Sequence, residues 1–244
     1  MTLESLLLFI SLALLAEILG TIGGFGSSLF FVPIASYFFD FYSVLGITAL
    51  FHVSSNLAKI TLFRKGFDKN LIINIGIPAV LFVIIGAYLS KFIDPKILEI
   101  FLALFLILVS ATFLIFKNIT VKATLTNSIG GGVASGLIAG LLGTGGAIRG
   151  IVLAAYNLKK EVFIATSSII DLGIDLSRSV VYSANGYINK EILYLIPILL
   201  IVSIIGTFIG KKILEHVSEE QFKSIVLILV FITGVFTLAK IYFK

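Results

Sequence analysis

Apolar residues run along most of this chain in stretches of up to about 20 residues, and polar or charged residues gather mainly in the short segments between them. A helix of about 20 residues crosses a hydrocarbon core about 30 Å thick. The pattern therefore predicts an all-α polytopic membrane protein. The apolar stretches cover residues 3–22, 27–39, 43–63, 70–91 and 96–116, and then 124–142, 146–158, 162–183, 190–210 and 220–242.

Composition supports this class and narrows the chemistry. The chain is 59% hydrophobic and 13% charged, whereas soluble domains carry about 25% charged residues. There is no Cys, and the two His residues are His52 and His216, so we expect no thiolate chemistry, no metal site and no cofactor. The net charge of +5 comes from Lys and Arg residues in short loops, where they orient a protein against membrane lipid; we expect no nucleic-acid partner.

Location follows from the N-terminus and the number of apolar stretches. The chain starts Met1-Thr2-Leu3-Glu4, without the basic region of a cleavable signal peptide, and its first apolar stretch is longer than a signal sequence. We therefore expect a multi-pass protein of the cell membrane.

The second half of the chain repeats the first. An ungapped shift of 120 positions places Gly20 on Gly140, Gly66 on Gly186 and Gly86 on Gly206. Two homologous halves, 1–120 and 121–244, are predicted, each with five apolar stretches. Duplicated halves are common in secondary transporters, whose substrate site lies where the repeats meet.

The second stretch of each half has about 13 residues, too short to cross comfortably, so each is expected to be a half-helix. If these stretches continue across, the chain has eight membrane segments and the loop charges show no bias; if they turn back, it has ten. Ten segments place ten basic residues on one side and five on the other, which favours inverted repeats with both termini outside. The ten are Arg64, Lys65, Lys69, Lys117, Lys122, Lys159, Lys160, Lys211, Lys212 and Lys223.

A glycine cluster precedes each short stretch. Four glycines within seven residues destabilise a helix by about 1 kcal/mol each relative to Ala, and the freed backbone groups must be buried in protein or line a polar cavity. A broken helix also presents N–H groups that favour an anion; the alternative is that the small residues only allow close helix packing. The candidate substrate-binding residues are Gly23, Gly24, Gly26, Ser27, Ser28, Gly143, Thr144, Gly145, Gly146 and Arg149.

The first cluster carries a family resemblance. Residues 20–33 read Gly-x-x-Gly-Gly-Phe-Gly-Ser-Ser-Leu-Phe-Phe-Val-Pro, with a weaker echo beginning at Gly140. This paired signature resembles that of the TauE/SafE family of sulfite and organosulfonate exporters, over essentially the whole chain. The resemblance implies a membrane transporter whose substrate is sulfite, a sulfonate or a related sulfur oxyanion.

Ionisable residues within apolar stretches are functional candidates. Arg149 lies near the start of the second half-helix, where its guanidinium could bind an oxyanion or pair with an aspartate. Two stripes at helical spacing suggest a shared aqueous pathway, or internal ion pairs: His52, Asn56 and Lys59, and Asp171, Asp175 and Arg178. Glu17, three residues before the first glycine break, is a candidate proton carrier.

These features predict a secondary transporter of a small anion. No Gly-x-x-x-x-Gly-Lys-Ser/Thr nucleotide signature is present, so we expect coupling to the proton gradient. One alternative is a passive anion channel. Another is a membrane-embedded enzyme using Ser54, His52 and an Asp, although His52 and Ser54 are two positions apart on one helix and point to different faces.

Overall fold

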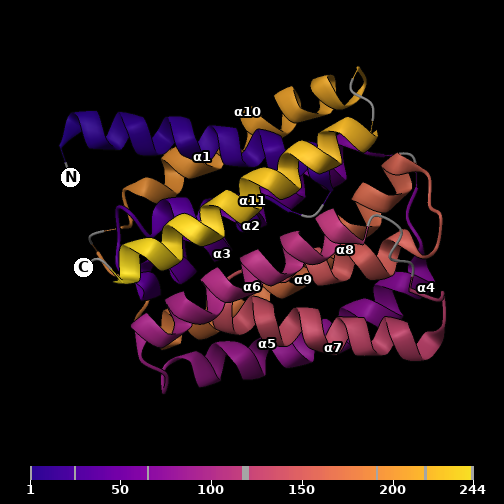
Figure 1. Ribbon diagram of the computed structural model, residues 1–244, viewed down its shortest axis with the longest axis horizontal. Coiled ribbons are helices and arrows are strands. Elements are labelled where there is room, and N and C mark those ends of the chain that lie inside the picture. Colours follow the sequence, from indigo (N-terminus) through magenta and orange to yellow (C-terminus); the bar gives the residue numbers. More distant parts are fainter. Residues whose placement is uncertain are drawn as a thin grey trace.

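The computed structural model describes residues 2–24, 26–64, 66–116, 121–190, 192–216 and 219–242, without the side chains of 219–227, 229 and 240. Lys65, Lys117 and the side chain of Lys223 lie outside this description, so their predicted place is untested. The described residues form ten continuous helices and no strand (Figure 1). These are α1 (Leu3–Gly23), α2 (Ser28–Ala35), α3 (Phe41–Leu62), the continuous α4, η1 and α5 (Lys69–Leu71, Ile72–Gly76, Ile77–Ser90), α6 (Pro95–Ile115), α7 (Leu125–Leu142), α8 (Gly146–Ala154), α9 (Lys160–Ala184), α10 (Leu195–Leu214) and α11 (Glu219–Tyr242).

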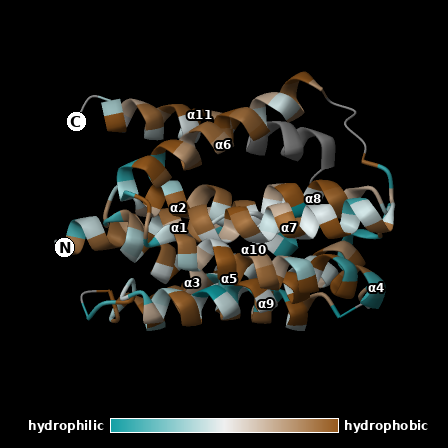
Figure 2. Cartoon of the chain, turned by 90° about the horizontal axis from the view of Figure 1, so that it is seen from below, coloured by the Kyte–Doolittle hydropathy of each residue, from teal (hydrophilic) through white to brown (hydrophobic). Residues whose placement is uncertain are grey.

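Six of these helices are long and apolar enough to cross a membrane: α1, α3, the α4 to α5 helix, α6, α7 and α10. Each has the length expected for a hydrocarbon core about 30 Å thick, and large apolar side chains such as Phe101, Leu108 and Ile201 are exposed on the outside. Figure 2 shows hydrophobic residues over the outer helices and hydrophilic ones near the chain turns, including α4. The chain is a multi-pass membrane protein.

The two short helices turn back along the helices that precede them. Gly20 packs directly against Ser27, and the Phe9 ring lies 5.2 Å from that of Phe38, so α2 returns along α1. In the second half Ser128 and Tyr156 are joined by a hydroxyl hydrogen bond of 2.6 Å, so α8 returns along α7. Both short stretches therefore form helices that turn back instead of continuing the preceding helix.

Glycine permits each reversal. Gly24 follows α1 with φ 68°, and Gly143 follows α7 with φ 76°. This left-handed backbone conformation is accessible to Gly without steric cost. Gly20 and Gly140 serve differently, because both are helical and close-packed: Gly140 lies against the backbone of Val83 and Ala87 on α5. The glycine clusters thus combine both predicted roles, breaking helices and packing them.

Contacts between the two halves are reciprocal. Helix α1 packs on α10. The 120-position shift places α1 on α7 and α5 on α10, and α7 packs on α5 in the same way. One contact occurs in both places: Gly206 packs on the side chain of Glu17, and Gly86 packs on the backbone oxygen of Leu137.

Equivalent helices run in opposite directions where they meet. Asn56 contacts Asp175 and His52 contacts Arg178, so α3 and α9 are antiparallel. Helices α6 and α11 pack together, and Figure 1 shows them running oppositely, with both chain ends at the same end of the molecule. Arg149 and Arg178 are among the largest fully buried side chains, so the centre of this helical assembly is charged.

Candidate functional site

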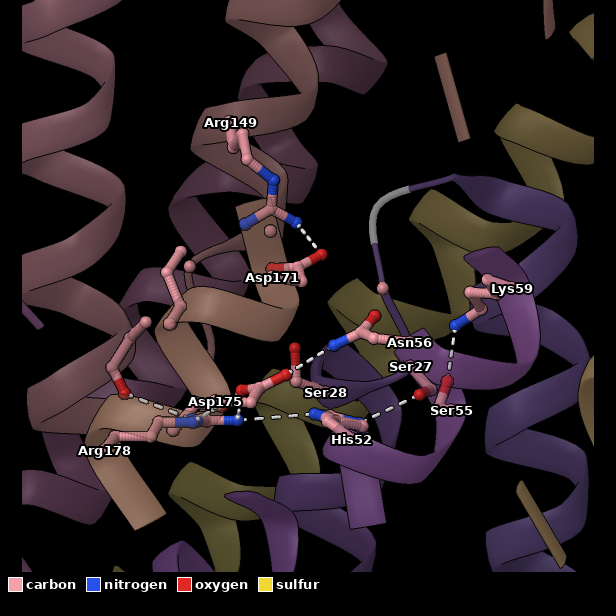
Figure 3. A pocket seen from close by; sticks show the side chains of 16 residues that line it. Ser27, Ser28, His52, Ser55, Asn56, Lys59, Arg149, Asp171, Asp175 and Arg178 are labelled. Carbon is pink, nitrogen blue, oxygen red and sulfur yellow. Dashed lines mark hydrogen bonds and ion pairs between the residues drawn. The ribbon is translucent and has the colours of Figure 1, made fainter. Parts of the chain in front are cut away.

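A cavity lies where the two breaks meet in the centre of the molecule (Figure 3). The hydroxyl oxygens of Ser28 and Thr144, one from each break, are 3.1 Å apart. The cavity has a volume of about 20 Å³, which is enough for one or two water molecules. Its lining residues are Gly26, Ser27, Ser28, His52, Ser55, Asn56, Lys59, Ala139, Gly143, Gly145, Gly146, Arg149, Asp171, Ile174, Asp175 and Arg178.

Two helix N-termini point at this cavity. Helix α2 starts at Ser28 and α8 at Gly146, and neither start has a side-chain cap. The first N–H groups of a helix have no partner within the helix, and the helix dipole places partial positive charge there. The two short helices therefore direct positive potential at one place from opposite halves of the chain.

Glu17 is the centre of the first polar cluster. Its side chain is fully buried and forms an ion pair with Lys59 on α3 at 2.9 Å. Four hydroxyl groups also donate to the carboxylate at 2.6 to 3.1 Å, from Thr21, Ser27, Ser55 and Thr207. These donors lie on α1, immediately before α2, on α3 and on α10, so the carboxylate links four helices.

Arg178 on α9 is the centre of the second cluster, one position before the residue that the 120-position shift places on Lys59 of α3. Its guanidinium pairs with Asp175 at 2.7 Å, and its NH1 group donates to the backbone oxygens of Ala139 and Gly143. Those oxygens belong to the end of α7, where the helix dipole favours a cation; the Ala139 oxygen also accepts from the Gly143 N–H. Arg178 therefore stabilises the second break.

His52 connects the two clusters. Its Nε2 lies 2.9 Å from Ser27 Oγ, and its Nδ1 lies 3.3 Å from Arg178 NH2. Ser27 donates its only hydroxyl proton to Glu17, so it must accept from His52 Nε2–H; Nδ1 then accepts from Arg178. This pattern describes a neutral imidazole within a continuous chain of hydrogen bonds from α9 to α1.

Arg149 and Asp171 form the third charged pair. Arg149 extends from α8 and is 2% exposed, and its NH2 group donates to the Asp171 carboxylate while Nε donates to Ser167 Oγ at 3.2 Å. Figure 3 shows the pair beside the cavity, apart from the chain through His52. The Arg149–Asp171 pair joins α8 to α9, whereas the Asp175–Arg178 pair lies within α9. All four side chains line the cavity together with Lys59.

Most predicted residues lie at this cavity, but four do not line it. Gly24 lines a smaller neighbouring cavity, together with Gly26, Asn56, Lys59 and Asp171. Thr144 contacts the cavity wall through Ser28, and Glu17 lies behind Ser27. Gly23 ends α1 and lines neither cavity. The stripes on α3 and α9 contact each other, Asn56 with Asp175 and His52 with Arg178.

Sequence reasoning missed three serines. Ser55 lines the cavity and bonds both Glu17 and Lys59, while Ser167 and Ser168 line the neighbouring cavity. Ser55 precedes Lys59 by four positions and therefore shares its helical face, so this spacing identifies Ser55 from the sequence. Ser54 points elsewhere, because its hydroxyl accepts from Ser203 on α10. Ser54 and His52 therefore do not form a catalytic pair.

Comparison with known proteins gives two matches. Residues 9–237 match the family described as Sulfite exporter TauE/SafE. A probable membrane transporter protein of Methanocaldococcus jannaschii is 29% identical over 254 aligned positions, covering 95% of this chain and 94% of the relative. No solved structure matches. The family is one of transporters rather than enzymes. Because the match spans nearly the whole length, including both breaks and the charged cavity, this chain belongs to the TauE/SafE sulfite exporter family.

Proposed function

We propose that this protein is a secondary transporter of a small anion, such as sulfite, an organosulfonate or a related sulfur oxyanion, in the cell membrane. The observation that carries the proposal is the meeting of two uncapped helix N-termini and the buried Arg149 guanidinium at one cavity. Oriented N–H groups and a planar guanidinium fork are both suited to oxyanions. The family match supports the sulfur oxyanion class.

The two halves, 1–120 and 121–244, act as inverted repeats in this proposal. Reciprocal pairing of α1 with α10 and α5 with α7, together with the antiparallel α3 and α9, supports a two-fold axis in the membrane plane. Lys160 and Lys211 lie around one cavity with Leu62 and Phe63 at the end of α3, and Figure 1 shows α4, which starts at Lys69, at the end of the molecule opposite the termini. The positive-inside rule makes that end cytoplasmic.

The structure corresponds to a closed state of such a transporter. The central cavity of about 20 Å³ suits one or two waters rather than a tetrahedral oxyanion with several heavy atoms. An anion that enters it must displace side chains or move helices. Alternating access of one half against the other supplies such a motion in duplicated transporters.

A route leads from the cavity toward the basic end. The smaller cavity reaches Ile164, which packs with Phe63 and Ala165 in a buried apolar cluster. Phe63 also lines a cavity of about 380 Å³ together with Lys160 and Lys211. Since this cluster borders one cavity through Ile164 and the other through Phe63, we assign it as the closed gate on the cytoplasmic side.

Transport by purified protein in liposomes tests the proposal. Uptake of sulfite, sulfate, thiosulfate and methanesulfonate is measured with and without an imposed pH gradient. Accumulation of a sulfur oxyanion above its external concentration, only with the gradient, supports a proton-driven transporter. Flux that never exceeds equilibration identifies a passive channel, and no flux of any of the four anions contradicts the proposal.

A further inference from the structure

Among the described residues, the charged groups around the cavity balance, and each of the three cations there has an ion-pair partner. Lys59, Arg149 and Arg178 each form an ion pair, with Glu17, Asp171 and Asp175 respectively. A monovalent anion added to this described set brings the net charge to minus one in a buried site, where an uncompensated charge is strongly disfavoured. Binding of an anion therefore requires that one cation loses its carboxylate and that one negative charge is neutralised.

The hydrogen bonds show which pair can open. The Glu17 carboxylate accepts from Lys59 and four hydroxyl groups. Asp175 accepts from Asn56 at 2.7 Å as well as from Arg178, whose guanidinium is also held by the backbone at the α7 break. Opening either of these pairs would break a network that holds several helices together.

Asp171 differs from both. The only hydrogen bond to its side chain among the described residues comes from Arg149. Its side chain is 19% exposed, whereas those of Glu17 and Asp175 are 0% and 5% exposed. It also lines both the central and the neighbouring cavity. Asp171 is thus the carboxylate that water reaches most easily and that loses the fewest bonds when it is protonated.

The groups around Asp171 place it in a mainly cationic setting. Arg149 faces it from α8 and Lys59 from α3, which also brings Asn56 and the neutral His52 to the cavity. Asp175 and Arg178 follow it on α9. The α1–α2 loop contributes Gly24 and Gly26, while η1 and α5 meet α9 through Gly76 and Val80.

We propose that Asp171 takes up one proton as the anion binds, and that this releases Arg149 to the anion. The Asp171 carboxylate and a proton taken up from the bulk solution give the neutral acid, and the Arg149 guanidinium exchanges the carboxylate oxygen for oxygens of the anion. A monovalent anion and a proton then enter together, and the site stays neutral. This inference rests on the proposed anion transport and names its coupling residue.

Binding of methanesulfonate to the purified protein tests the inference, since this sulfonate keeps its single negative charge across the pH range used. Calorimetry gives the dissociation constant at each pH, and a pH indicator in weak buffer gives the protons taken up. We expect one proton per anion and an affinity that weakens about tenfold per pH unit where free Asp171 is ionised. Asp171→Asn should bind without proton uptake and with affinity independent of pH.

A control and a second readout complete the design. Asp94→Asn makes the same substitution at the start of α6, where Asn also caps a helix, and should retain one proton per anion. Infrared difference spectra of the wild type should show a protonated carboxyl band on addition of methanesulfonate, and Asp171→Asn should lack it.

The negative results distinguish the role of Asp171 from anion transport itself. Anion binding by the wild type without proton uptake overturns the role of Asp171 and leaves anion transport standing. Proton uptake that persists in Asp171→Asn also overturns it. If the wild type binds neither methanesulfonate nor sulfite at any pH, the proposed function itself fails, and this inference fails with it.

Discussion

The hydroxyl oxygens of Ser28 and Thr144 lie 3.1 Å apart, although 116 positions separate them in the chain. Each residue belongs to one of the two glycine breaks, so this contact joins the starts of α2 and α8 at the centre of the molecule. It also places both helix N-termini beside Arg149. The anion-binding proposal depends on this convergence, which neither half of the chain could produce alone.

Arg149→Lys tests the guanidinium. Lysine keeps the charge but loses the planar fork, so we expect apparent affinity for the transported anion to weaken by about tenfold or more while some transport remains. Arg149→Ala should lose much more, because it removes the charge and leaves Asp171 without its partner. Uptake kinetics at matched protein levels in liposomes give the comparison, and equal affinities for wild type and Arg149→Lys would argue against bidentate binding.

Gly145 tests the packing of the second break. A Cβ atom there would overlap the backbone oxygen of Ser135 and lie 3.0 Å from the Ala139 side chain, so Gly145→Ala should lower the thermal unfolding midpoint in detergent. Gly130→Ala on α7 is the matched control, because nothing lies within 4 Å of that position, and it should leave the midpoint unchanged or raise it. A normal midpoint for Gly145→Ala would show that α8 is not packed closely on α7.

Two equivalent loop glycines test the topology. Gly66 and Gly186 are both exposed, and nothing lies within 4 Å of a Cβ atom added at either position, so a single Cys in this Cys-free chain fits at each place and is accessible to a reagent. Inverted repeats predict that a membrane-impermeant thiol reagent labels Gly66→Cys only from the cytoplasmic side and Gly186→Cys only from outside. Labelling of both from one face would rule out inverted repeats.

Glu17→Gln tests the buried network. An amide nitrogen cannot accept a hydrogen bond, so Gln leaves Lys59 without its counterion and places a donor among the four hydroxyl donors. Loss of one partner of a buried ion pair costs about 3–5 kcal/mol. We therefore expect Glu17→Gln to lower the free energy of unfolding, measured in detergent micelles, by about that amount. Glu4→Gln, at an exposed position of the same helix, should change it by about 1 kcal/mol or less. Similar losses in both variants would contradict a structural role for Glu17.

Much of this arrangement could be predicted from sequence because helical periodicity is local. The spacing of His52, Asn56 and Lys59 placed them on one face, and the same spacing on α9 predicted its partner face. Both stripes meet as expected, with Asn56 on Asp175 and His52 on Arg178. Helix ends were less predictable: α8 ends at Ala154 and not near residue 158, because apolar residues continue into the following turn.

The partners of Glu17 could not be predicted. Its hydroxyl donors include Ser55 and Thr207, which lie 38 and 190 positions away, and serine or threonine within an apolar helix has no distinctive pattern. The separate roles of neighbouring glycines were also hidden. Gly20 packs on Ser27 while Gly24 adopts the left-handed conformation, and only the path of the chain after the break distinguishes them.

We propose that a sulfur oxyanion binds at Arg149 between the two breaks. The most direct test is uptake driven by a pH gradient in liposomes that contain either wild type or the double variant Arg149→Ala with Asp171→Ala, which removes the whole ion pair and keeps the cavity neutral. We predict that the wild type accumulates sulfite or methanesulfonate above the external concentration and that the folded double variant does not. Accumulation by the double variant equal to that of the wild type would show that Arg149 only neutralises Asp171, and would contradict this account.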